Sequence, residues 1–120
     1  MSRVLVIEDD PGIARLLKRG LALEGIEVDI AEDGFAGREL WERGGFDLVI
    51  LDVMLPGVDG LSLCAERRTA GDEVPIILLT ARDEEEIAHR AREAGITACI
   101  GKPFSFPELL ERVTALLKAG

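Results

Sequence analysis

The sequence predicts an α/β fold, a doubly wound five-stranded parallel sheet with helices on both faces. Three short segments, residues 4–7, 48–51 and 76–79, are continuously apolar and rich in Val, Ile and Leu, as parallel strands buried on both faces are. Segments with helical spacing of apolar residues alternate with these strands. The chain has 120 residues, 48% of them hydrophobic, which is enough for one core but not for two domains. We therefore expect residues 1–120 to form one domain.

Two weaker strands complete the predicted sheet. Residues 28–30 alternate between apolar and polar side chains and residues 98–100 form a brief apolar run, so we expect both strands at the sheet edges. Right-handed crossover connections allow few strand orders. The order 2-1-3-4-5 places the carboxyl ends of strands 1 and 3 at the switch point of the sheet, where folds of this kind bind ligands.

Five helices are predicted, and the first and last have the clearest starts. Asp10 is a natural N-cap and Pro11 a natural first residue of the helix that Gly25 ends. Ser105 and Glu108 form a capping box for the last helix. The fourth helix has few large apolar residues and should be lightly anchored. The second, third and fourth helices are expected at about 35–43, 61–70 and 83–94, with Phe35, Ala36, Leu40, Leu61, Cys64 and Ala65 turned inward.

The charge balance bears on partners and location. There are 23 acidic against 14 basic residues, a net charge of −9, which argues against direct binding to nucleic acid or to an anionic membrane. No apolar run could span a bilayer, and the first strand begins too early to leave room for a signal peptide. Cys64 and Cys99 lie in apolar stretches without metal-type spacing, so we expect two buried thiols in a reducing compartment. The expected location is the cytoplasm.

Polar side chains end the predicted central strands. Glu8 and Asp9 follow the first strand directly, and Asp52 follows the third, so their carboxylates should meet at one edge of the sheet. Clustered carboxylates repel one another unless a cation is present, and an oxygen-only site suits Mg²⁺. Lys102 follows the fifth strand and could pair with Asp52 or with a phosphoryl oxygen, and the Thr80 hydroxyl at the end of the fourth strand could donate to the same oxygen.

Four motifs occur in order, each at the end of an expected strand: VLVIEDD at 4–10, LDVMLPGVDG at 51–60, LTA at 79–81 and GKPF at 101–104. Together they resemble the receiver domain of bacterial two-component response regulators. The motif style is closest to the subfamily with winged-helix DNA-binding outputs, and the resemblance covers essentially the whole chain. It implies a flavodoxin-like three-layer α/β/α fold and a phosphorylation-dependent signalling switch.

The resemblance also implies roles for individual residues. Asp52 would accept a phosphoryl group from a sensor histidine kinase or phosphotransfer protein, forming an aspartyl phosphate. Lys102 and Thr80 would contact the phosphoryl oxygens. The Mg²⁺ ligands would be Asp9, Asp52, the backbone carbonyl of Met54 and, through water, Glu8. The domain would promote only its own phosphorylation and dephosphorylation, and would relay the signal to an output domain or effector protein.

The sequence departs from the family at the switch position. The family has an aromatic residue three positions before the lysine, where this chain has Cys99. An acidic pair normally precedes that aromatic residue, and here Thr97 and Ala98 take its place. In the winged-helix subfamily those acids help to form a salt-bridged dimer through the fourth helix, fifth strand and fifth helix. We therefore expect only a weak homodimer on phosphorylation; the alternative is that Cys99 is a buried core residue and the switch is unaltered.

Two further expectations follow from the resemblance. The peptide bond between Lys102 and Pro103 is commonly cis in the family, and a cis bond here would aim the ammonium into the site. Met54 and Arg82 stand where family side chains overlook the path of the attacking water. Because both are large, we expect slow hydrolysis of the aspartyl phosphate.

Three other functions fit the sequence less well. A haloacid-dehalogenase-like phosphatase needs a second acid two residues after its nucleophile, where this chain has Met54. A flavodoxin-like flavin binder needs Gly, Ser or Thr donors after the first strand, where this chain is acidic. The strongest rival is a receiver-like adaptor that binds partners without phosphorylation. The complete set of five polar residues disfavours it, and acyl-phosphate labelling of Asp52 would separate the two.

Overall fold

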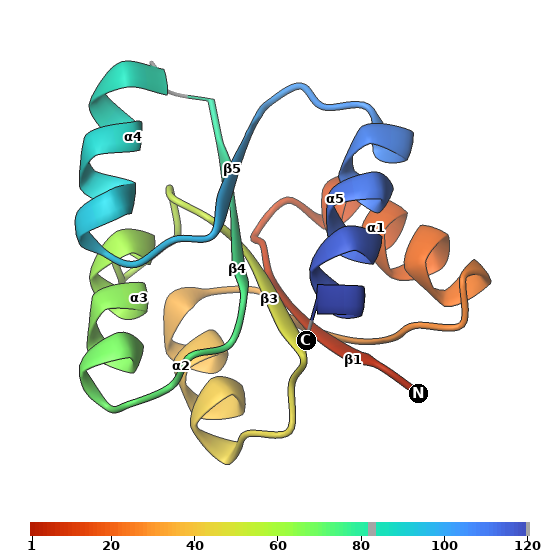
Figure 1. Cartoon of the computed structure of the whole chain (residues 1–120), viewed down its shortest axis with the longest axis horizontal. Helices are drawn as coiled ribbons and strands as arrows, with labels where there is room; N and C mark the ends of the chain where they lie inside the picture. The colour runs from red at the N-terminus through yellow and green to blue at the C-terminus, as the bar shows by residue number, and fades with distance from the viewer. Residues whose placement is uncertain (82–83, 120) are drawn as a thin grey trace.

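The computed structural model describes residues 1–81 and 84–119, with the side chains of 84–88 left out. Strands and helices alternate along the chain (Figure 1). The strands are β1 (Arg3–Ile7), β2 (Glu27–Ala31), β3 (Leu48–Asp52), β4 (Ile76–Thr80) and β5 (Ala98–Gly101). The helices are α1 (Pro11–Leu23), α2 (Gly34–Arg43), α3 (Gly60–Thr69), α4 (Glu84–Glu93) and α5 (Phe106–Ala119).

The five strands form one parallel sheet in the order β2-β1-β3-β4-β5. This is the predicted order, with the two weaker strands at the edges. Helices α1 and α5 cover one face of the sheet, and α2, α3 and α4 cover the other (Figure 1). The three-layer α/β/α fold is therefore confirmed. Among the described residues, no helix is long and apolar enough to cross a membrane.

The core lies on both faces of the sheet because the strand side chains alternate. Leu5 and Ile7 pack on the side of α2, α3 and α4, and Val4 and Val6 pack on the side of α1 and α5. All four are fully buried. Apolar burial on both faces stabilises the central strands and keeps their ends in place.

The predicted starts of α1 and α5 are confirmed. The Asp10 carboxylate accepts hydrogen bonds from the amides of Gly12 (2.8 Å) and Ile13 (3.3 Å), which caps α1. The Ser105 hydroxyl accepts a hydrogen bond of 3.4 Å from the amide of Glu108 at the start of α5. These caps satisfy amides that have no partner inside the helix.

Three side chains differ from the sequence-based expectation. Phe35 is 61% exposed, because it lies in the first turn of α2 and leans on the loop after β3. Ala65 is exposed, since Leu63 rather than Ala65 completes the buried stripe of α3. Cys99 is exposed because β5 is an edge strand, whereas Cys64 is buried as predicted.

Two of the sequence-based expectations concern residues that the structure does not describe. Arg82, one of the two side chains expected to shield the aspartyl phosphate, lies outside the described residues, as does the predicted helix start at Asp83. Within the described part, α4 spans Glu84–Glu93, and Gly95 follows with a φ of 75°, a conformation that favours glycine. The expected length of this helix is thus close to that found.

Candidate functional site

The register of the strands brings the polar residues together. The last residue of β1 pairs with the residue before Asp52, so Glu8 and Asp52 are neighbours at the carboxyl edge of the sheet. On the other side of β3, Thr80 ends β4 and pairs with Gly101, the last residue of β5. Lys102 is the next residue, and its amide donates a 2.8 Å hydrogen bond to the Thr80 carbonyl. Four strand ends therefore contribute to one site.

Lys102 lies at the centre of this site. Its Nζ donates hydrogen bonds to Asp52 Oδ2 at 2.6 Å and to Glu8 Oε2 and Oε1 at 3.0 and 3.2 Å. The Lys102–Pro103 peptide bond is cis, as predicted. The lysine side chain is 16% exposed, so both ion pairs are largely shielded from water. The ammonium neutralises part of the gathered negative charge.

Glu8 is the most enclosed of the acids, at 1% exposure. Its Oε1 also accepts a 3.1 Å hydrogen bond from the amide of Asp10. Burial raises the pKa of the Glu8 carboxyl and the charge of Asp52 acts in the same direction, against the opposing hydrogen bonds from Lys102 and Asp10. Burial alone would lower the pKa of Lys102. The hydrogen bonds to Asp52 and Glu8 outweigh the effect of burial, and the pKa of Lys102 is raised.

The acids also fit a hard metal ion. Glu8, Asp9 and Asp52 each offer a carboxylate oxygen, and these oxygens lie within 4.8 Å of one another. Asp9 is exposed, whereas Glu8 and Asp52 are buried. The Met54 amide donates a 2.9 Å hydrogen bond to Asp52 Oδ1, which fixes one side of that carboxylate. This all-oxygen donor set can hold Mg²⁺.

The five predicted polar residues all lie at this edge, but one contact among them was not predicted. The sequence suggested that Lys102 would pair with Asp52 or with a phosphoryl oxygen, and the structure adds Glu8 as a second partner. A carboxylate directly after a buried strand was the available signal, since such a group needs a partner. Thr80 is 2% exposed at the end of β4. Met54 is 55% exposed, so its side chain borders the solvent.

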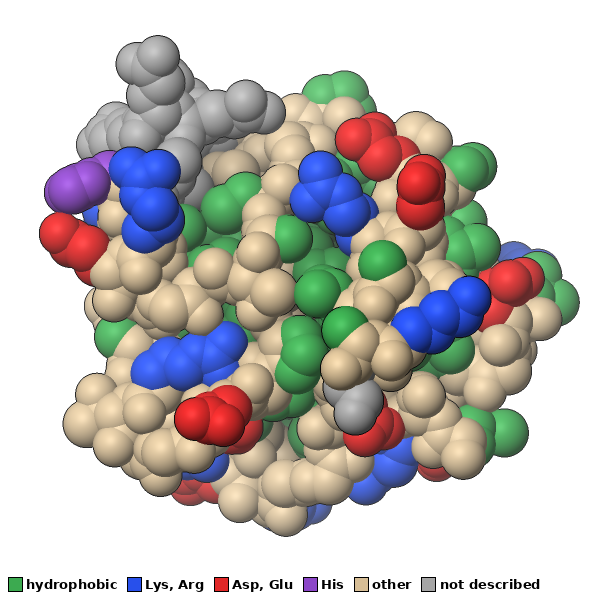
Figure 2. Space-filling model, viewed as in Figure 1, with side chains coloured by type: hydrophobic (Ala, Val, Ile, Leu, Met, Phe, Trp, Pro, Cys, Tyr) green, Lys and Arg blue, Asp and Glu red, His purple; other side chains and the backbone are tan. Residues whose placement is uncertain are grey.

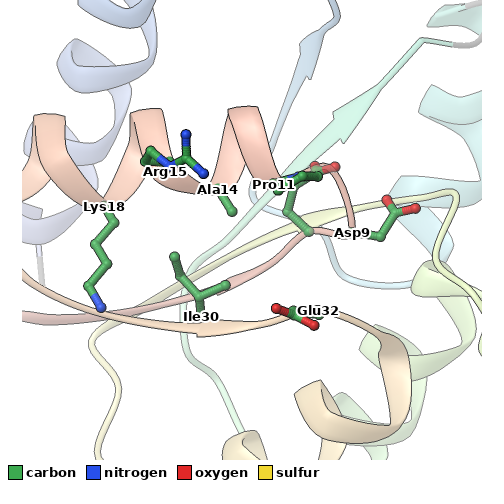
Figure 3. Close-up of a pocket in the computed structure, with 8 residues that line it drawn as sticks. Asp9, Pro11, Ala14, Arg15, Lys18, Ile30 and Glu32 are labelled. Atoms are coloured by element: carbon green, nitrogen blue, oxygen red, sulfur yellow. The ribbon is translucent and has the colours of Figure 1, made fainter.

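A pocket of about 480 Å³ adjoins the acidic site on the side of α1. Figure 3 shows Arg15 and Lys18 reaching from α1 and Glu32 following β2, with Ile30 between them. The remaining lining residues are Glu8, Asp9, Pro11 and Ala14. The two cations bring positive charge to the flank of an otherwise acidic region.

Comparison with known protein families identifies a family with this sequence pattern. The model of the response regulator receiver domain matches residues 4–114. The chain belongs to this family. Response regulators named MprA are similar in sequence: that of Mycobacterium sp. (strain KMS) is 40% identical over 116 residues, covering 97% of this chain and 50% of the relative. That of Mycobacterium leprae is also 40% identical, with 97% and 51% covered. The chain thus spans about half the length of these relatives.

Solved structures of receiver domains are also similar. A Francisella response regulator 1452 receiver domain matches with a TM-score of 0.94 at 34% identity, covering 99% of this chain and 98% of that one. The Thermotoga maritima response regulator TrrA, solved in complex with Mg²⁺-BeF, matches with a TM-score of 0.86 at 39% identity, covering 97% and 99%. The sequence comparison and the structure comparison therefore both identify the receiver domain.

Proposed function

We propose that residues 1–120 act as one receiver domain, switched by transfer of a phosphoryl group to Asp52. The donor is a sensor histidine kinase or a phosphotransfer protein. The observation that carries the proposal is the 2.6 Å contact between Lys102 and Asp52 within a cluster that also contains Glu8 and Asp9. One buried nucleophile, one fixed cation and two further acids are the groups that phosphoryl transfer requires.

The transfer follows from the position of Asp52. A carboxylate oxygen of Asp52 attacks phosphorus, the new O–P bond forms as the N–P bond to the donor histidine breaks, and the imidazole leaves. The Met54 amide keeps Oδ1 in place during this step. The Lys102 ammonium and the Thr80 hydroxyl then contact phosphoryl oxygens, where negative charge gathers in the transition state.

We further propose that the reaction depends on Mg²⁺. Asp9, Asp52 and the Met54 carbonyl would hold the ion directly, and Glu8 would hold it through water. The ion would neutralise charge between the carboxylates and the incoming phosphoryl group. The fit of the three carboxylates and the similarity to TrrA, which was solved with Mg²⁺-BeF, support this assignment. Arg15 and Lys18 on the flanking pocket would favour the approach of an anionic donor.

The proposed domain catalyses only its own phosphorylation and dephosphorylation, and it acts in the cytoplasm. Its signal passes to an output domain or effector protein, without direct contact to nucleic acid or membrane by this domain. The competing function is that of an adaptor that binds partners without phosphorylation. Lys102 disfavours the adaptor, because a partner surface has no need of a buried lysine between two carboxylates.

Labelling with a small acyl phosphate tests the proposal. Wild-type protein with Mg²⁺ should incorporate one phosphoryl group, Asp52→Asn none, and Asp9→Asn much less. Asp47→Asn is the matched control, since it makes the same change just before β3, at the other end of the same strand. Labelling of Asp52→Asn at the wild-type level would contradict the proposal, and an unlabelled wild-type protein would favour the adaptor.

A further inference from the structure

The loop that follows the phosphoacceptor rests against the start of α2. Gly34, the first residue of α2, lies so close to Val58 that a Cβ on Gly34 would come within 3.0 Å of Val58 Cγ2. From the other segment, the ring of Phe35 covers Gly57, where an added Cβ would clash with Cε2 of the ring and come within 3.1 Å of Cδ2 and Cζ. Gly57 has a φ of 80°, which also favours glycine. The start of α2 and the loop after β3 therefore pack closely against each other at Gly34 and Gly57, where neither position has room for a side chain.

This loop begins with the groups that shape the site. Met54, at its start, donates its amide to Asp52 Oδ1, and its carbonyl is a proposed Mg²⁺ ligand. At the far end, the Gly60 amide donates a 3.3 Å hydrogen bond to the Val53 carbonyl, and a Cβ on Gly60 would lie 2.6 Å from the Asp52 carbonyl. The start of the loop is thus held by Asp52, the last residue of β3, and its far end packs against Asp52 and Val53. Between these ends, Phe35 packs against Gly57 in the middle of the loop.

We propose that Phe35 is a positioning residue for the metal site, acting through the loop that carries Met54. The ring is 61% exposed although it is large and apolar, and its exposed position places it against Gly57 of the loop. Removing the ring frees Gly57, whose wide conformational range then lets the Met54 carbonyl turn away from the metal. The inference rests on the proposed Mg²⁺-dependent phosphorylation and adds a residue that touches neither ion nor phosphoryl group.

The test measures Mg²⁺ affinity by calorimetry on Phe35→Ala, Phe35→Tyr and wild type. We expect Mg²⁺ to bind Phe35→Ala about tenfold more weakly, by analogy with residues that orient metal ligands. Phe35→Tyr keeps the ring on Gly57 and should bind as wild type does. Leu23→Ala is the matched control, because it removes an 86% exposed apolar side chain at the end of α1.

Labelling by acyl phosphate separates positioning from general damage. For Phe35→Ala the labelling rate should fall at low Mg²⁺ and approach the wild-type rate at saturating Mg²⁺, with a melting temperature close to that of Leu23→Ala. Wild-type affinity in Phe35→Ala, equal weakening in Leu23→Ala, or no recovery in Phe35→Tyr would each overturn the inference. A wild-type protein that neither binds Mg²⁺ nor becomes labelled would instead overturn the proposed function on which the inference rests.

Discussion

Lys102 is the residue on which the charge balance of the site depends. It is 16% exposed and donates to two buried carboxylates, those of Glu8 and Asp52. Without it, two buried anions would face each other with no cation, which is far more costly than losing an exposed ion pair. The same ammonium occupies the neighbourhood of the proposed metal, so lysine and Mg²⁺ compete for the negative charge of these carboxylates.

Replacing this lysine should therefore affect stability and metal binding in opposite directions. In a chelator, Lys102→Met should lower the free energy of unfolding by about 3 kcal/mol, because two carboxylates are left buried and unpaired. Mg²⁺ should restore stability and bind more tightly than to wild type, although labelling should be lost. Urea denaturation with and without Mg²⁺ measures both effects. Equal stability of the two proteins in chelator would contradict this account.

The pH dependence of the lysine contribution has a definite sign. The folded pKa of Lys102 is raised above its ordinary value of 10.5, so its stabilising effect is complete below that pH. It should disappear only as pH rises through the folded pKa. The stability difference between wild type and Lys102→Met should therefore stay constant from neutral pH to about pH 10. Denaturation midpoints across this range check it, and a difference that vanished near neutrality would be inconsistent.

The two cysteines should differ in reactivity, because Cys64 is buried and Cys99 is exposed. Burial raises the pKa of the Cys64 thiol to about 12, so little thiolate forms. Cys99 is exposed on β5. Native protein treated with iodoacetamide at mildly alkaline pH should gain one adduct, on Cys99, and Cys99→Ser should gain none. Mass spectrometry gives the count, and a rapid second adduct in the native protein would contradict the burial of Cys64.

At the scale of elements, we expect the signal to leave the domain through the face formed by α4, β5 and α5, as the family resemblance implies. Figure 2 shows this face, with apolar side chains along its centre and charged side chains of both signs around it. The buried residues described in α4 and just after it are Ala91 and Ala94, both small. The light anchoring of this helix stays a prediction, because the side chains of residues 84–88 lie outside the described part. Cys99, on β5, has too little volume to replace the family's aromatic ring.

We therefore expect weak association through this face. With Mg²⁺ and beryllofluoride, a phosphoryl mimic, amide shifts should change in α4 while sedimentation shows little dimer. Cys99→Tyr should gain dimer under the same conditions, because the ring can fill the space behind Thr80. Cys99→Ser is the matched control and should behave as wild type. A tight wild-type dimer through this face would contradict the expectation.

The sequence predicted the elements well where caps and apolar runs were strong. Asp10 and Ser105 start their helices as expected, because a side-chain oxygen at such a position satisfies helix amides whatever packs around it. Phe35 was wrongly placed inside, since an apolar residue in a first helical turn can pack on a loop instead of the sheet. The predicted burial of Cys99 was also wrong. An edge strand leaves one side of its residues open to solvent, and the local composition around Cys99 does not reveal that exposure.

At the scale of the whole molecule, the apolar runs and the handedness of crossovers left few strand orders, and the predicted order 2-1-3-4-5 is the one found. That order alone brings Glu8, Asp52, Thr80 and Lys102 to one edge, which is why the site could be predicted before any coordinates. The pairing of Lys102 with Glu8 could not be predicted, since it depends on the rotamers of two side chains that lie 94 residues apart in the sequence. The contact of Phe35 with Gly57 likewise depends on tertiary packing.

Mapping the phosphorylated residue tests the central claim most directly. Wild-type protein is incubated with Mg²⁺ and an acyl phosphate, the aspartyl phosphate is reduced with borohydride, and the peptides are sequenced by mass spectrometry. The account predicts one modified residue, Asp52, and no modification when a chelator removes Mg²⁺. Modification of a different residue, or equal modification of Asp52 in the chelator, would contradict it.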